Sequence, residues 1–224
     1  MTLIISGIIV EINKKDVKSM RLYVKPPNGD VTVSAPLSMS DEVIEKFVKS
    51  KTGWIKEQVE KIRNLYYSPE REYVSGETIN VWGKQYNLEL KFGNKYSLIL
   101  CDDTAILTAR KTSTVDQRKK FVHEWYRELL IAEITRLLPK WEEKTNLKVS
   151  SWHTKYMTTR WGTCKSKQRK IWFNLQLAAK PTECLEYIIL HELMHFIERG
   201  HNKTFYSLLG KYMPSWKKVR ALLK

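Results

Sequence analysis

Apolar and polar residues alternate with a period of two through much of the first half of the chain, which predicts β-strands. Such strands are expected over residues 3–12, 20–25, 30–35, 78–82, 86–92, 96–101 and 104–109. Turns are expected at residues 26–30 and 102–103, which are rich in Pro, Gly, Asn and Asp. Two helices interrupt the strands, one after a capping Ser40 and one that carries Trp54, and a linker-like stretch follows at 66–75.

The second half changes to helical spacing, with apolar residues three and four positions apart. The expected elements are a helix over about 115–138, a hairpin formed by 149–158 and 171–177 around a basic loop at 165–170, a helix after Pro181 and a last helix interrupted by Pro214. Pro139 ends or kinks the first of these helices, because proline lacks the N–H donor. The pattern predicts an α+β fold, with a β-rich domain over residues 1–112 and a second domain over residues 113–224.

The helix after Pro181 contains His191, Glu192 and His195 in an H-E-x-x-H motif. Residues four positions apart lie on one face of a helix, so both imidazoles can bind one metal ion. Glu192 follows the first imidazole directly and can reach a water molecule at that metal. Three protein nitrogens and one open position are typical of a catalytic zinc site, which predicts hydrolysis by an activated water.

His201, six positions after His195, is the candidate for the third ligand. Gly200 favours the end of the helix just before it, because glycine accepts the left-handed conformation. Residues 202–224 contain neither Asp nor Glu, which leaves Glu198 as the carboxylate that could replace His201. Cysteine can also bind zinc, but packing is the favoured interpretation of Cys164 and Cys184.

The composition is that of a folded protein, with 42% hydrophobic residues and eight tryptophans. Three widely spaced cysteines indicate reduced thiols, so we expect a cytoplasmic protein. The N-terminal segment has the pattern of a first strand and not of a signal peptide, and the chain lacks the run of about 18 apolar residues that a membrane span needs.

Positive charge is concentrated in the second half of the chain. Residues 1–100 contain 15 Lys and Arg against 12 Asp and Glu, whereas residues 101–224 contain 24 against 12. Between Glu143 and Glu183 the chain has no acidic residue. A positive field beside the metal would attract an anionic substrate or partner, although a generally basic surface gives the same count.

Two further segments accompany the motif: Met157–Cys164, which contains Arg-Trp-Gly-Thr-Cys, and Ile171–Asn174. With the helix over residues 182–199, they resemble the YgjP-like zinc metallopeptidase family. The metal core of that family is similar to the cores of SprT-like and other gluzincin-like peptidases. Weaker similarity extends to Arg21–Val24, Trp54-Ile55 and Pro214–Trp216.

The resemblance implies a β-rich N-terminal region with two helices, followed by a zincin-like helical metallopeptidase core with a small antiparallel sheet. An edge strand of such a sheet can hold an extended peptide through main-chain hydrogen bonds. The catalytic domain would be residues 113–224, with His191, His195 and His201 as zinc ligands and Glu192 as general base.

Other residues of these segments are candidates for substrate contact. Arg160 could stabilise an oxyanion or bind a phosphate with two hydrogen bonds, or it could tie the hairpin to the metal helix without a catalytic role. We predict that Trp161, Lys165 and Asn174 contact the substrate.

Three functions are compatible with these residues. The favoured one is a zinc-dependent peptidase that cleaves a peptide or protein. The alternative is a metal-dependent nucleoside triphosphate (pyro)phosphohydrolase, in which the basic hairpin binds an anionic nucleotide. A third is a nucleic-acid-associated protease or binding module, because basic residues interleave with aromatic ones that could stack on bases, namely Trp152, Tyr156, Trp161, Trp172 and Phe173. Packing in the core is the competing interpretation of these aromatics.

Overall fold

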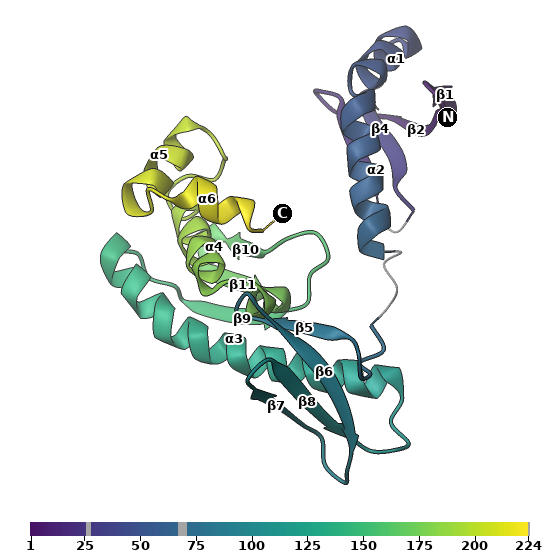
Figure 1. Ribbon diagram of the computed structural model, residues 1–224. Coiled ribbons are helices and arrows are strands. Elements are labelled where there is room, and N and C mark those ends of the chain that lie inside the picture. Colours follow the sequence, from purple (N-terminus) through teal and green to yellow (C-terminus); the bar gives the residue numbers. More distant parts are fainter. Residues whose placement is uncertain (26–27, 67–70, 224) are drawn as a thin grey trace. The chain divides into compact units, whose positions relative to one another are not determined.

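The computed structural model describes residues 1–25, 28–66 and 71–223, and the chain divides into two compact units (Figure 1). The first unit is Met1–Glu70 and the second is Arg71–Lys224. The boundary expected after residue 112 falls inside the second unit. Residues 26, 27 and 67–70, which belong to the expected turn and linker, lie outside the described residues.

The first unit is a four-stranded sheet covered on one face by two helices (Figure 1). Its elements are β1 (Thr2–Ile5), β2 (Ile8–Lys15), β3 (Arg21–Lys25), β4 (Asp30–Pro36), α1 (Asp41–Ser50) and α2 (Thr52–Tyr66). The strand order is β1-β2-β4-β3, with β2 and β4 parallel. Val10 and Val33 of the sheet pack against Ile44, Val48 and Ile55 of the helices, all of them fully buried.

The single strand expected over residues 3–12 is wrong, because the chain reverses in the middle of that segment. Ser6 and Gly7 both have positive φ, 51° and 76°, and join β1 to β2 in a tight hairpin. The apolar residues on both sides of this turn continue the alternation, so the pattern alone does not reveal the turn. Positive φ at both central positions is typical of two-residue hairpin loops.

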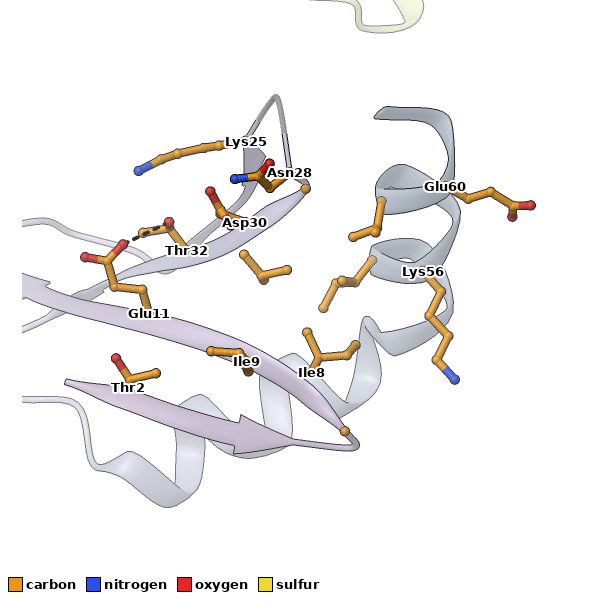
Figure 2. Close-up of a pocket in the computed structure, with 15 residues that line it drawn as sticks. Thr2, Ile8, Ile9, Glu11, Lys25, Asn28, Asp30, Thr32, Lys56 and Glu60 are labelled. Atoms are coloured by element: carbon orange, nitrogen blue, oxygen red, sulfur yellow. Dashed lines mark hydrogen bonds between the residues drawn. The ribbon is translucent and has the colours of Figure 1, made fainter. Parts of the chain in front are cut away.

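A hollow of about 950 Å³ lies in the first unit between α2 and the strand ends that face it (Figure 2). Both positively and negatively charged side chains line it, among them Lys25, Asp30 and Lys56. Glu11 accepts a hydrogen bond from Thr32 Oγ1 over 3.3 Å there. The described residues that line this hollow include neither His nor Cys, so its chemistry differs from that of the metal motif.

The second unit begins with a four-stranded sheet that packs on the first half of a long helix. The elements are β5 (Thr78–Val81), β6 (Lys84–Phe92), β7 (Ser97–Cys101), β8 (Thr104–Ala109) and α3 (Val115–Thr145). The strand order is β5-β6-β8-β7. Leu88 and Leu107 form a core with Val122 of α3, and Tyr126 Oη donates to the Asn80 carbonyl over 2.7 Å.

Pro139 does not end α3, in contrast to the expected end near residue 138, and the helix continues to Thr145. The residues after the proline are held by packing: Trp141 is buried, and its Nε1 donates to Glu186 Oε2 over 3.1 Å. Proline inside a helix costs about 3 kcal/mol, so tertiary contacts of the last turns must offset that cost. The second half of α3 therefore belongs to the core that surrounds the metal motif.

A three-stranded sheet lies beside this core, in the order β10-β11-β9. Its elements are β9 (Ser151–Lys155), β10 (Gly162–Lys165), the short 3₁₀ helix η1 (Ser166–Gln168), β11 (Lys170–Asn174) and the 3₁₀ helix η2 (Leu175–Ala179). The predicted pairing of residues 149–158 with 171–177 as a hairpin is wrong, since β9 and β11 are parallel. The antiparallel partner of β11 is β10, so the sheet is mixed. Residues 156–169 join β9 to β11 and include β10, and this length allows the crossover that parallel strands need.

Three helices complete the chain: α4 (Thr182–Met194), α5 (Lys203–Tyr212) and α6 (Trp216–Ala221). Pro214 lies between the last two, as its position in the sequence predicts. Leu185, Leu190 and Leu193 of α4 are fully buried. None of the helices that the structure describes is both long and apolar enough to cross a membrane.

The start of α3 predicts a measurable difference between two N-caps. Thr114 and Gln117 form a reciprocal capping box, whereas Ser215 at the start of α6 makes no side-chain cap hydrogen bond. Thr114→Ala should lower the free energy of unfolding by about 1 kcal/mol. The matched control Ser215→Ala should change it by less than roughly 0.5 kcal/mol. Denaturant unfolding measures both values, and equal losses would contradict the capping argument.

Candidate metal centre

His191, His195 and His201 converge on one point at the surface of α4. Each offers a ring nitrogen, and the three nitrogens lie within 4.8 Å of one another, so the group could hold a metal ion. His191 Nε2 and His201 Nε2 are 3.0 Å apart. The i, i+4 spacing places the first two rings on one face, and the centroid of each is 4.8 or 4.9 Å from that of the third ring. The structure thus brings together the three histidines that the sequence singles out.

The chain leaves α4 earlier than expected, at Met194 instead of residue 199. His195 keeps right-handed helical backbone angles, and its Nδ1 is 3.0 Å from the Glu198 carbonyl oxygen, which orients the ring. The stop expected at Gly200 is therefore wrong. Glu198 Oε1 accepts a hydrogen bond from Gly200 N over 3.0 Å, and its carboxylate is not part of the histidine group.

The ring of Phe205 packs against all three imidazoles. It is fully buried at the start of α5, and its ring centroid lies 4.9, 4.7 and 4.8 Å from those of His191, His195 and His201. Asn202 fixes this start, because its side chain accepts the Phe205 N–H over 3.0 Å. The turn after α4 and the cap of α5 together bring the third histidine back to the first two.

The surroundings of His191 and His201 favour the neutral form of these two rings. Burial is the largest cause for His191, and electrostatic interactions with His195, His201 and Arg220 add to it, so the pKa of His191 falls to about 3. Burial and the charges of His195 and Arg220 also lower the pKa of His201. A metal ion binds neutral imidazole, so the lowered pKa values of His191 and His201 suit these two rings to a divalent cation near neutral pH.

Glu192 lies in the wall behind the histidines and is only 4% exposed. Burial raises the pKa of its carboxyl to about 7, although a hydrogen bond from Cys164 and the charge of Arg160 oppose the rise. The backbone of Gly162 lies against this side chain: a Cβ there would be 2.7 Å from Glu192 Oε1 and 2.8 Å from Ile188 Cγ2. A carboxyl with a pKa near neutrality can both accept and return a proton.

A cavity of about 860 Å³ opens over the histidines and Glu192. Three guanidinium groups line it, those of Arg160, Arg199 and Arg220. Glu192 is the one carboxylic acid among the described lining residues. The cavity therefore combines a possible metal position, a proton acceptor and a positive rim.

A family model described as YgjP-like, metallopeptidase domain matches residues 18–224. The chain belongs to the YgjP-like metallopeptidase family. No curated protein matches it. The match covers the whole of the second unit and most of the first, so this YgjP-like chain shares with its family more than the histidine motif.

The structure brings some of the predicted substrate-contact residues to the cavity of the YgjP-like domain and leaves others away from it. Arg160 and Trp161 line it. Lys165 is exposed at the end of β10 and does not line it; its ammonium lies 5.7 Å from the ring centroid of Trp172. Asn174 is 2% exposed and also lies outside the lining.

Asn174 instead shapes the loop that presents Arg160. Its Nδ2 donates to the carbonyls of Met157 and Arg160 over 2.7 and 2.6 Å, and its Oδ1 accepts from the Met157 and Gln176 N–H groups. The polar atoms of its side chain are thus engaged within the protein. These hydrogen bonds to the loop backbone explain why a polar residue is buried at position 174.

The aromatic residues and histidines near the motif mostly have packing roles. Phe173 is fully buried, and Trp152 and Trp161 pack against the same core. His123 stacks on Tyr156 with 5.2 Å between ring centroids. This placement supports core packing over base stacking for most of the aromatic group.

Sequence reasoning did not single out Arg199 or Arg220. Arg199 follows the motif in the turn after α4, whereas Arg220 comes from α6 and reaches the cavity through tertiary packing. Its guanidinium carbon lies 5.9 Å from the Tyr206 ring centroid, and Tyr206 stacks on Trp216. In the sequence, the aromatic residue Trp216 after Pro214 is the feature that could have indicated packing of α6 near the site.

The contact between Gly162 and Glu192 predicts that a methyl group at position 162 would destabilise the fold. Gly162→Ala should lower the free energy of unfolding by about 1–3 kcal/mol, because the new Cβ overlaps atoms of a packed core. The control is Gly210→Ala in α5, whose Cβ would lie 3.7 Å from Trp216, an ordinary contact. That substitution should stabilise the helix by roughly 0.5–1 kcal/mol. Urea unfolding of both variants checks the opposite signs.

Proposed function

We propose that this YgjP-like domain is a zinc-dependent metallopeptidase. Its ligands would be His191, His195 and His201, and its general base would be Glu192. The observation that carries the proposal is the convergence of three imidazoles beside a buried carboxyl in one cavity. Zinc on three imidazoles supplies a Lewis acid that acidifies water and polarises a carbonyl group.

Glu192 moves the proton in this proposal. Its carboxylate accepts the proton of the attacking water and then passes it to the leaving amine of the substrate. The apolar surroundings that raise its pKa to about 7 suit both directions of transfer. Ile188 and Gly162 exclude bulk water from the side of the carboxyl that faces the protein.

An extended peptide could bind along β10. This strand is at the edge of its sheet, paired on one side with β11, and Gly162, Thr163 and Cys164 line the cavity. A substrate strand could add to the free edge through main-chain hydrogen bonds, as in other cases of β-strand addition. That binding mode would place a peptide carbonyl beside the histidines without requiring a particular side chain.

Arg160 is placed to act on the negative charge that develops at that carbonyl. It precedes β10, lines the cavity, and its charge reaches Glu192. The Asn174 hydrogen bond to the Arg160 carbonyl holds the backbone of this residue in place. A guanidinium near that carbonyl could stabilise an oxyanion.

The three arginines favour a second candidate, hydrolysis of a nucleoside triphosphate at the same site. Arg160, Arg199 and Arg220 could bind phosphate oxygens, and Arg pairs with phosphate through two parallel hydrogen bonds. Enzymes of that kind usually recruit Mg²⁺ through carboxylates, whereas the described lining here offers Glu192 alone. Peptide hydrolysis is therefore the first choice.

Substitution of the general base tests the mechanism. Glu192→Gln should retain the metal and reduce turnover by roughly 10²–10⁴-fold, because the amide cannot take a proton. Glu183→Gln on the exposed first turn of α4 is the matched control and should keep full activity. Both proteins are loaded with zinc and assayed on a panel of peptides and nucleoside triphosphates. Release of phosphate or pyrophosphate without peptide cleavage would select the second candidate, and full activity of Glu192→Gln would exclude the mechanism.

Removal of the third imidazole tests the metal site separately from turnover. His201→Ala should weaken zinc binding and abolish the rise in melting temperature that zinc gives the wild-type protein. His153→Ala is the control, since His153 is exposed on β9 and belongs to a different surface. Isothermal titration with zinc and thermal unfolding provide both readouts. Unchanged affinity in His201→Ala would show that a different residue is the third ligand.

A further inference from the structure

The three-stranded sheet β10-β11-β9 has one face turned to the core and one face turned away from it. Ile171 and Phe173 of the central strand are fully buried on the inner face. Successive residues of a strand point to opposite faces, so Trp172 belongs to the outer face. The strand register places Thr163 of β10 and His153 of β9 beside it. An aromatic side chain thus occupies the middle of the outer face.

Trp172 differs from the other aromatic residues of this segment. Trp152 and Trp161 pack against the core around α4, and Phe173 belongs to that core. Trp172 is only partly buried and belongs to none of the three hydrophobic cores formed by the residues that the structure describes. Its ring is tilted against His153, with 5.9 Å between the ring centroids. Core packing therefore does not explain this tryptophan.

Two exposed lysines from the neighbouring strands lie over the ring of Trp172. The ammonium of Lys155 on β9 is 5.9 Å from the ring centroid, and that of Lys165 on β10 is 5.7 Å from it. Because β11 lies between β9 and β10, the two cations approach from opposite sides of the strand that carries the ring. Lys170, opposite Lys165 in the register, adds a third positive charge. None of these three lysines belongs to an ion pair within the described part of the chain.

No carboxylate of the three strands balances this charge. All three strands lie between Glu143 and Glu183, an interval without any acidic residue. Uncompensated ammonium groups attract a polyanion, and an aromatic ring among them offers a surface on which a base can stack. An anionic lipid surface fits less well, because Trp172 is the one large apolar side chain that the strands place on this face, whereas membrane-bound elements bury a broad apolar face.

We propose that the outer face of this sheet binds single-stranded nucleic acid, with a base stacked on Trp172 and the flanking phosphates bound by Lys155 and Lys165. In the complex the base takes the place of the ammonium groups over the ring, and the flexible lysine side chains turn to the phosphates. Such contacts are independent of base sequence, because every base has a π face and phosphates carry no sequence information. None of these three residues lines the cavity over the histidines, so the inference goes beyond the proposed peptidase activity.

Fluorescence anisotropy of labelled oligonucleotides tests the proposal on the zinc-loaded, full-length protein. Single-stranded DNA and single-stranded RNA should both bind more tightly than a DNA duplex of the same length, since paired bases cannot reach the tryptophan. The tighter of the two single strands identifies the preferred nucleic acid. The affinity should fall as salt rises from about 50 to 200 mM, because bound phosphates release their counterions.

Substitutions on the outer face separate stacking from charge. Trp172→Ala and Trp172→Leu should weaken binding roughly five- to a hundredfold, and Trp172→Phe should recover most of the loss because it restores a ring. Lys155→Ala and Lys165→Ala should each weaken binding and reduce the salt slope by about 0.7. The matched controls are Trp54→Ala, at an exposed tryptophan of α2, and Lys95→Ala, at an exposed lysine between β6 and β7; both should bind as the wild-type protein does.

Thermal unfolding identifies the folded variants, and Trp172→Leu serves as the ring deletion if Trp172→Ala does not fold. Absence of binding at about 50 mM salt, tighter binding of the duplex, or unchanged affinity after loss of the ring would overturn the proposal. Binding to phosphatidylserine vesicles but not to oligonucleotides would overturn it as well and assign the face to a lipid surface. These readouts require no substrate cleavage, so they stand or fall separately from the peptidase assay.

Discussion

The burial of α4 is the constraint on which the rest of the second unit depends. The helix must hide an acidic side chain within an apolar wall and still leave His191 and His195 open to a cavity. Three neighbours meet this requirement: α3 through Trp141, the edge strand through Gly162, and α5 through Phe205. These neighbours contact α4 at Glu186, at Ile188 and Glu192, and at His191.

Burying a carboxyl without strong partners costs free energy. Here the buried carboxyl is Glu192, which lies beside the histidines. Charged partners would have stabilised the ionised form of Glu192 and lowered its pKa, but burial dominates and raises that pKa to about 7. Natural proteins place such locally unfavourable groups where chemistry needs them. Three of the positive charges in this half of the chain line the cavity, on the exposed residues Arg160, Arg199 and Arg220, where solvent still screens them.

The sequence predicted the parts of the site that follow from local spacing. His191, Glu192 and His195 are within one helix, and His201 follows one short turn later, so i, i+4 geometry and a chain reversal suffice to place them. Arg220 could not be placed in this way, because it approaches through the packing of α6.

The same distinction separates the parts of the fold that the sequence predicted from those that it did not. Most helices and strands follow from periodicity, but which strands pair depends on long-range contacts. Residues 149–158 and 171–177 have the alternation of a hairpin, yet β10 occupies the antiparallel position beside β11. Pro139 predicts a helix end by local rules, and the burial of Trp141 overrides them.

The length of α3 has a consequence for how the second unit loses its structure. Val122 belongs to the core of the sheet β5-β6-β8-β7, and Ile134 of the same helix belongs to the core around α4. One rigid rod of 31 residues is thus shared by two hydrophobic cores. Opening either core removes packing from the other, so backbone amides in both should exchange with solvent through a common cooperative event. A substitution that destabilises the sheet β5-β6-β8-β7 would then also weaken metal binding at the histidines.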